Sequence, residues 1–240
     1  MMSSALVEAR GVHRSYGRGS VAVHAVAGVD LEVAPGEVVG LMGPSGCGKS
    51  TLLHLIGGLD VPDRGVVKVD GVDWVSLGGR ALAARRRAMC GFVFQNLLLL
   101  PTATAYENVE VPLVLGGVPA RERQQRVGEV LEKVGITAQA AHLPDQLSGG
   151  QQQRVGIARA IVHRPALILA DEPTGSLDST TAEQITQLLV DMAKAQGAAV
   201  VLVTHDPAVG AHADRVVRLH SGVIDTADQS RPTQGAGAAR

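Results

Sequence analysis

The stretch GPSGCGKST, residues 43–51, interrupts a part of the chain that is otherwise strongly apolar. Residues 37–42, directly before it, have the composition of a short buried strand. Directly after it, apolar residues recur at helical spacing, at Leu52, Leu55, Ile56 and Leu59. The predicted order around this stretch is therefore strand, glycine-rich loop and helix.

Residues 43–50 match the pattern G-x-x-x-x-G-K-[ST], a phosphate-binding loop when it joins a strand to a helix. Glycines let the backbone wrap closely and aim several N–H groups inward, and the following helix adds the positive end of its dipole. Lys49 is predicted to reach the β- and γ-phosphates, and the Ser50 hydroxyl to bind Mg²⁺. The other predicted nucleotide contacts in the loop are Gly43, Ser45, Gly46, Cys47, Gly48 and Thr51. The alternative, an ordinary glycine-rich turn, is disfavoured by the strand and helix on either side.

A second segment, LILADE at residues 167–172, is a buried strand that ends in two acids. The ends of parallel strands are where an open sheet presents groups to its ligand. Asp171 is therefore a predicted Mg²⁺ ligand, and Glu172 is predicted to orient or deprotonate a water molecule. The alternative is that the two acids merely begin a loop. The phosphate loop earlier in the chain disfavours that alternative but leaves kinases, GTPases and many ATPases open.

Composition disfavours several classes of protein. The chain has 240 residues, 45% of them hydrophobic, and a formal net charge of −1, which lacks the electrostatic footprint of a dedicated nucleic-acid binder. Two cysteines, Cys47 and Cys90, are too few for a disulfide framework and have no zinc-site spacing, so a reducing compartment is expected. No apolar run approaches the roughly 20 residues that span a bilayer, and the N-terminus has no signal-like apolar stretch. We therefore expect a cytosolic chain without a transmembrane helix.

The apolar pattern predicts an α/β organisation. Buried strands are expected at 91–95, 167–170 and 199–204, with a helix at 180–195, and strands that alternate with helices imply a parallel sheet covered on both faces. Residues 1–40 and 65–72 are expected to form antiparallel strands. The predicted division is a single domain at 1–225, in which 1–95 and 165–225 form a β subdomain and the phosphate-loop core and 96–164 form a helical subdomain. Residues 226–240 are predicted to be a disordered tail.

The segment LSGGQQQR, residues 147–154, is the most specific signal in the chain. A serine before a helix that starts with two glycines makes another anion-binding helix start, although such a sequence alone is more often an ordinary cap and turn. In this arrangement the chain resembles the ABC ATPases, the nucleotide-binding subunits of ABC transporters, and residues 147–154 resemble their signature sequence. The resemblance extends from residue 6 to residue 224, with the motifs in the expected order.

The resemblance implies a P-loop NTPase (RecA-like) core with an N-terminal antiparallel β subdomain and an inserted α-helical subdomain. It also implies a homodimer or pseudo-dimer in which two chains pack head to tail. ATP on one phosphate loop would then be capped by the signature sequence of the other chain, through Ser148, Gly149, Gly150 and Gln151.

Four further site residues follow from the resemblance alone. Gln95 matches a glutamine that senses Mg²⁺ and the attacking water, and His205 matches a histidine that contacts the γ-phosphate. Asp178 belongs to a loop, residues 176–178, that passes between the two ATP sites. Tyr16 lies where an aromatic residue stacks on adenine. The alternatives are that Gln95 is a plain surface glutamine, that His205 is structural and that Tyr16 simply packs.

Within the family, residues 57–60, 92–95 and 171–175 resemble the branch that contains lipoprotein-release and macrolide-export ATPases. This implies an ATP-hydrolysing motor whose ATP-driven dimer closure pulls on a separate integral membrane permease, at the inner face of the membrane. Three features depart from the family pattern: Ser176, Gly156 and the leucine-rich residues 96–100, which lie near the region that should face the permease.

Two other functions remain open at this stage. A soluble ABC ATPase of DNA repair, chromosome organisation or translation usually adds zinc modules, long coiled coils or a second ATPase domain, and the sequence contains none. The basic runs at 85–87 and 121–126 are better explained as solvated helix faces than as a nucleic-acid site. An ATPase that regulates a cell-division or envelope complex without transport is the closer alternative. The sequence does not identify the cargo or the permease.

Overall fold

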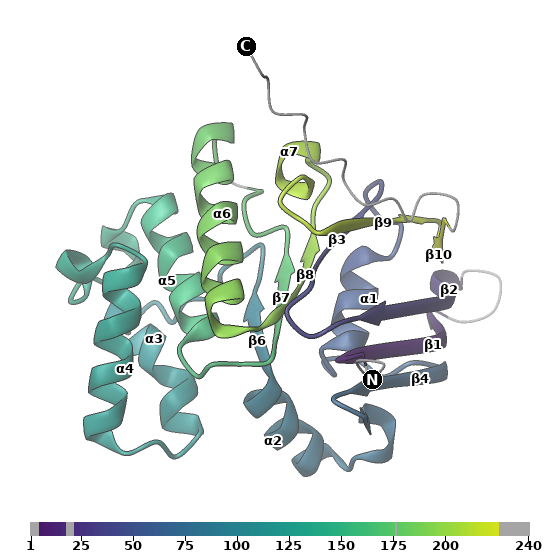
Figure 1. The fold of residues 1–240 in the computed structure, drawn as a ribbon, viewed down its shortest axis with the longest axis horizontal. Helices are drawn as coiled ribbons and strands as arrows, with labels where there is room; N and C mark the ends of the chain where they lie inside the picture. Colours follow the sequence, from purple (N-terminus) through teal and green to yellow (C-terminus); the bar gives the residue numbers. More distant parts are fainter. Residues whose placement is uncertain (1–4, 18–21, 176, 226–240) are drawn as a thin grey trace.

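A six-stranded sheet runs through the centre of the molecule, in the order β10-β9-β3-β8-β7-β6 (Figure 1). The structure is a computed structural model that describes residues 5–17, 22–175 and 177–225, so the predicted tail at 226–240 and Ser176 lie outside the described residues. Neighbouring strands are parallel, except that β10 is antiparallel to β9. The strands are β3 (Val38–Met42), β6 (Cys90–Val93), β7 (Leu167–Asp171), β8 (Ala199–Val203), β9 (Arg215–His220) and β10 (Val223–Ile224).

Side chains along this sheet alternate between two hydrophobic cores. Ile168 and Leu202 belong to the core shared with helices α5 (Gly149–Ile161) and α6 (Ser179–Gln196). Leu169 and Val201 belong to the core shared with helix α1 (Lys49–Ile56). Because both faces of β3, β7 and β8 are buried, these central strands need apolar residues at nearly every position, which explains why they appear as continuous apolar runs in the sequence.

A second, antiparallel sheet packs on the α1 side, in the order β2-β1-β4-β5. Its strands are β1 (Val7–Tyr16), β2 (Val23–Val33), β4 (Arg64–Val69) and β5 (Val72–Asp73). Apolar residues of β1, β2 and β4 share one core with α1, so the helix after the glycine-rich stretch lies between the two sheets (Figure 1). The antiparallel strands predicted near the N-terminus are confirmed.

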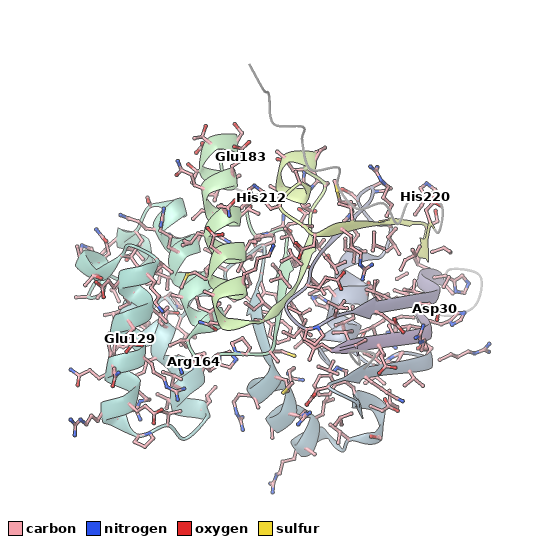
Figure 2. All side chains as sticks on the ribbon, viewed as in Figure 1. Asp30, Glu129, Arg164, Glu183, His212 and His220 are labelled. Carbon is pink, nitrogen blue, oxygen red and sulfur yellow. The ribbon has the colours of Figure 1, made fainter. Side chains whose placement is uncertain are left out.

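The chain between β6 and β7 is largely helical. Residues 94–166, all of which are described, contain no strand, and their helices are α3 (Ala105–Leu115), α4 (Ala120–Lys133) and α5. Glu129 on α4 and Asp30 on β2 lie toward opposite ends of the long axis (Figure 2). Among the described residues, the remaining helices are α2 (Gly79–Met89), α7 (Pro207–Gly210) and the short 3-10 helices Trp74–Ser76, Thr137–Gln139 and Pro144–Gln146. No helix in the described ranges is both long and apolar enough to cross a membrane.

The structure departs from the predicted elements at two strands. β6 ends at Val93, so Gln95 lies two residues beyond the strand and not at its end. β9, which pairs with β3, was not predicted, because Arg215 and Arg218 break its apolar run. The fold class was predicted correctly: a parallel core, an antiparallel β subdomain and a helical region are all present.

Candidate functional site

Most of the predicted site residues lie at or just after the ends of four neighbouring parallel strands. The glycine-rich loop follows β3, the acids end β7, and the segments with His205 and Gln95 follow β8 and β6. Parallel strands have their carboxyl ends at one edge of the sheet, which is where α/β folds bind ligands. The topology therefore gathers at one edge residues that lie far apart in the chain, from Gly43 to His205.

The glycines of the loop are required by close backbone contacts. A Cβ at Gly43 would lie 2.1 Å from the carbonyl oxygen of Leu219, and a Cβ at Gly48 would lie 1.9 Å from that of Ala25. Gly46 differs, because a Cβ there would meet nothing within 4 Å, although its φ of 77° favours glycine. Two glycines thus pack the loop against neighbouring strands, and the third leaves open space beside it.

Lys49, Ser50 and Asp171 form the polar floor of the site. The buried Lys49 ammonium donates to the carbonyl oxygens of Gly43 and Pro44, at 2.8 and 2.9 Å. The Ser50 hydroxyl donates to Asp171 Oδ1 at 2.9 Å. Burial raises the pKa of the Asp171 carboxyl, and the hydrogen bond from Ser50 offsets only part of this effect. A hydroxyl beside a carboxylate supplies the oxygen donors that Mg²⁺ prefers, so these residues fit the ion.

A hollow of about 380 Å³ brings half of the predicted site residues together. It contains the glycine-rich loop together with Tyr16, Gln95 and Glu172. Ala25, which the sequence did not point to, also lines it. The full lining is Tyr16, Ala25, Ser45, Gly46, Gly48, Lys49, Ser50, Thr51, Gln95 and Glu172.

Glu172 and His205 form a pair beside this hollow. His205 Nδ1 lies 3.1 Å from Glu172 Oε1, and both residues line a second hollow of about 280 Å³. Glu172 has a φ of 44°, a left-handed conformation that is uncommon outside glycine, and its N–H donates to the carbonyl oxygen of Val203 at 3.0 Å. The turn after β7 therefore holds the carboxylate between the two hollows.

Gln95 lies close to Glu172 across Gly175. A Cβ built on Gly175 would be 3.5 Å from the Gln95 amide nitrogen and 3.6 Å from Glu172 Oε2. Gln95 and Gly175 also line a third hollow, of about 410 Å³, together with Gly149. The structure thus places Gln95 near Glu172, although the glutamine stands on a loop and not at the end of a strand.

Two loop residues that were predicted to contact the nucleotide lie outside the lining of the hollow. Gly43 and Cys47 do not line it, and Cys47 is buried with its sulfur 3.9 Å from the Lys49 nitrogen. Asp178 lies elsewhere, as the N-cap of α6, where its side chain accepts from the N–H of Thr181 at 3.0 Å. Hydrogen bonds to backbone and side chain at this cap hold the pKa of Asp178 below its ordinary value.

The signature segment is not part of the hollow. Ser148 caps α5 through a capping box: its hydroxyl accepts from the N–H of Gln151 at 3.3 Å, and the Gln151 side chain accepts from the N–H of Ser148 at 2.9 Å. Gly149 and Gly150 begin the helix, where backbone N–H groups have no intrahelical partner. Residues 148–151 are all described, and none of them lines the hollow that contains the phosphate loop.

Comparison with known proteins gives a consistent result. Residues 26–175 match the family model described as ABC transporter. The lipoprotein-releasing system ATP-binding protein LolD of Legionella pneumophila (strain Paris) is 43% identical over 223 residues, which cover 93% of this chain and 98% of that protein. The macrolide export ATP-binding/permease protein MacB of Marinobacter nauticus is 46% identical over 219 residues, 91% of this chain and 34% of MacB.

A solved structure is similar over nearly the same length. It is the dimeric, post-hydrolysis state of the ATP-binding cassette MJ0796 bound to ADP and Pi, with a TM-score of 0.86 and 42% identity. The match covers 94% of this chain and 98% of that chain.

Proposed function

Because this chain belongs to the ABC transporter family, we propose that it is the ATP-hydrolysing subunit that drives a separate membrane permease of the export or lipoprotein-release type. The observation that carries the proposal is the hollow that unites the phosphate loop, Tyr16, Gln95 and Glu172. The similarity of the chain to LolD and MacB favours transport over the cell-division alternative.

The phosphate end of ATP would be held by the glycine-rich loop. The backbone N–H groups of the loop and the Lys49 ammonium would bind the β- and γ-phosphates, and the Tyr16 ring, which lines the same hollow, would stack on the base. Ser50 and Asp171 would hold Mg²⁺, with Gln95 nearby. When bound, Mg²⁺ would neutralise phosphate charge, and it would also offset the cost of keeping the Asp171 carboxylate buried.

Hydrolysis would be assisted by Glu172. An attacking water forms a bond to the γ-phosphorus, the bond from that phosphorus to the β–γ bridging oxygen breaks, and the water proton passes to the Glu172 carboxylate. His205, 3.1 Å from that carboxylate, would contact the γ-phosphate and keep Glu172 oriented. Gln95 would orient the water from across Gly175.

The site would be completed by a second copy of the chain. Residues 148–151 lie outside the hollow of their own chain, although the amides that begin α5 suit an anion. The similar cassette MJ0796 is dimeric. In such a dimer Ser148, Gly149, Gly150 and Gln151 would cover ATP bound to the partner, and Asp178 would lie between the two sites. Closure on ATP and opening after hydrolysis would then move the permease.

An apolar groove of about 430 Å³ is the proposed surface for the permease. It lies between α2, β6, α3 and α5, and its lining includes Phe92, Leu98 and Leu115, with Arg86 and Arg159 among the polar residues. Leu98 and Leu115 are 64% and 60% exposed and line the same groove, and an exposed apolar patch of this kind is typical of an interaction site. The groove also adjoins the leucine-rich segment at 96–100.

The proposal is tested by purifying tagged Glu172→Gln from membranes of the native host, in gentle detergent with ATP and Mg²⁺. We expect an integral membrane permease to co-purify, and a Leu115→Asp change in that background to remove it while ATP binding persists. Val223→Asp, a change at a similarly exposed position on β10, is the matched control and should retain the permease. Recovery of only soluble or DNA-associated proteins would contradict the transport function. Unchanged ATP affinity in Lys49→Ala would contradict the ATP site.

A further inference from the structure

Arg14, Tyr16 and Asp60 form a closed cluster, and Tyr16 is its one member that lines the hollow. The Tyr16 hydroxyl donates to Asp60 Oδ2 at 2.8 Å. Arg14 donates to both oxygens of the same carboxylate, from Nε at 2.9 Å and from its terminal nitrogen at 2.8 Å. Asp60 is therefore bonded to Tyr16 and to Arg14, which are 44 and 46 positions away from it in the chain.

The guanidinium also covers the Tyr16 ring. The central carbon of the Arg14 guanidinium lies 5.0 Å from the ring centroid, within the range of a cation–π contact. Its remaining terminal nitrogen donates to Asp63 Oδ1 at 2.9 Å, so the guanidinium is held on both sides. The ring is thus fixed through its hydroxyl and one face, while Tyr16 is 43% exposed and lines the hollow.

Asp60 is itself held firmly by the loop after α1. Its N–H donates to the carbonyl oxygen of His54, and its Oδ1 accepts from the N–H of Val61 at 2.8 Å. Burial favours the neutral acid, but the hydrogen bonds from Tyr16 and Val61 and the charge of Arg14 outweigh it, so the pKa of Asp60 lies below its ordinary value. The carboxylate is ionised at neutral pH and accepts all of these bonds.

We propose that Asp60 and Arg14 are positioning residues that fix the Tyr16 ring for the nucleotide base, an inference that rests on the proposed ATP site. A ring that is already ordered loses less conformational entropy when a base stacks on it, so binding is tighter. Neither residue lines the hollow, so their effect on ATP passes through Tyr16. Their loss should weaken the hold on the base and leave the hold on the phosphates unchanged.

The test compares Mg²⁺-ATP with Mg²⁺-tripolyphosphate, which has the phosphates but no base, by isothermal titration calorimetry. Loss of stacking in Tyr16→Ala should raise the ATP Kd roughly tenfold or more. Asp60→Ala should raise it about three- to tenfold, because the Tyr16 side chain must then be ordered when the base binds. Tripolyphosphate should bind equally well to both variants and to the wild type. In steady-state assays the ATP KM should rise in Asp60→Ala while kcat stays the same.

A double-mutant cycle separates positioning from general damage. Adding Asp60→Ala to Tyr16→Ala should weaken ATP binding no further, because the ring on which Asp60 acts is gone. Tyr16→Phe keeps the ring and removes only the O–H donor, so it should show a smaller rise in Kd even if Asp60→Ala folds poorly. Glu32→Ala is the control. It breaks the ion pair between Glu32 and Arg10, which lies on β1 like Arg14, and it should leave the Kd of both ligands unchanged.

Three results would overturn the proposal: wild-type ATP affinity in Asp60→Ala and Tyr16→Phe, equal weakening of ATP and tripolyphosphate, or additive effects in the double mutant. In each of these cases, the proposed ATP site would still be supported if the wild-type protein binds both ligands. A wild-type protein that binds neither ligand would overturn the ATP site and this proposal together.

Discussion

Gly48 and Gly149 both stand at the start of a helix, yet their surroundings differ sharply. A Cβ at Gly48 would lie 1.9 Å from the Ala25 carbonyl oxygen, whereas the nearest atom to a Cβ at Gly149 would be Leu177 Cδ2 at 3.6 Å. The first glycine is enclosed by its own chain and the second is open. The phosphate loop is therefore built within one chain, and the start of α5 is free to face another molecule.

Mixing two inactive variants tests this difference with the largest expected effect. Lys49→Ala damages the phosphate loop, and Gly149→Asp places a negative charge at the start of α5, where there is room for it. Each alone should lose about 100-fold or more in ATPase rate. A one-to-one mixture should recover up to about a quarter of wild-type activity, since half of randomly formed dimers would hold one intact site of two.

ATPase assays of the separate and mixed proteins measure the recovery. Lys49→Ala mixed with Lys49→Ala,Gly149→Asp is the control, and it should stay inactive because every phosphate loop is damaged. A test mixture that is no more active than its parts would contradict a site made from two chains.

Substitutions inside the loop should separate its glycines by their contacts. Gly48→Ala places a methyl group against the Ala25 carbonyl and strains a φ of 105°, so we expect a loss of roughly 3 kcal/mol or more in the free energy of unfolding. Gly46→Ala has the unfavourable φ but open space, so about 1 kcal/mol is expected. Urea unfolding measures both, and equal losses would show that backbone conformation alone sets the need for glycine.

Features that depend on the local sequence were predicted, whereas features that depend on contacts between distant residues were not. Residues 43–51 were identified because nine residues poor in core-forming side chains interrupted an apolar region, and the buried strands were identified because both of their faces are covered. The role of Asp60 was not predicted, because it depends on Tyr16 and Arg14, which are far away in the chain. β9 was missed because Arg215 and Arg218 interrupt the apolar pattern of a strand that pairs with β3.

Asp171 and Asp214 should respond to pH in opposite directions. Burial raises the pKa of Asp171 in the folded protein, so its ionisation destabilises the fold as pH rises from about 4 toward neutrality. Asp171→Asn should therefore be more stable than the wild type at pH 7 without ligand, and this advantage should shrink as pH falls toward the ordinary pKa of an aspartate. Thermal unfolding between pH 3.5 and 7.5, roughly the range in which the carboxyl titrates, measures the difference.

Asp214 is the control with the opposite sign. Burial opposes its ionisation, but hydrogen bonds from Lys194 and from the N–H of Val38 outweigh this and lower its pKa. Asp214→Asn should therefore be less stable than the wild type at pH 7, and the deficit should shrink as pH falls. A pH-independent difference for Asp171→Asn would mean that the burial of its charge does not affect stability.

The smallest expected effect lies where α5 contacts the segment after Gln95. A Cβ at Gly156 on α5 would lie 2.9 Å from Leu97 Cδ2, so two of the departures from the family pattern, Gly156 and the leucine-rich segment, are in contact. Arg159, one turn further along α5, donates to the carbonyl oxygens of Leu97 and Leu98. The segment after Gln95 is thus anchored on the helix that begins with the signature sequence.

Gly156→Ala should change the free energy of unfolding by less than about 1 kcal/mol, because the gain in helix propensity is offset by the displaced Leu97 side chain. In a Leu97→Ala background the space is free, so the same change should stabilise by up to about 1 kcal/mol. Gly128→Ala on α4, where a Cβ would meet nothing within 4 Å, is the control and should stabilise equally in both backgrounds. Equal effects of Gly156→Ala with and without Leu97 would show that the contact does not couple the loop after Gln95 to α5. Unequal effects would show that the Leu97 side chain and α5 are energetically coupled, which links the loop after Gln95 to the helix that begins with the signature sequence.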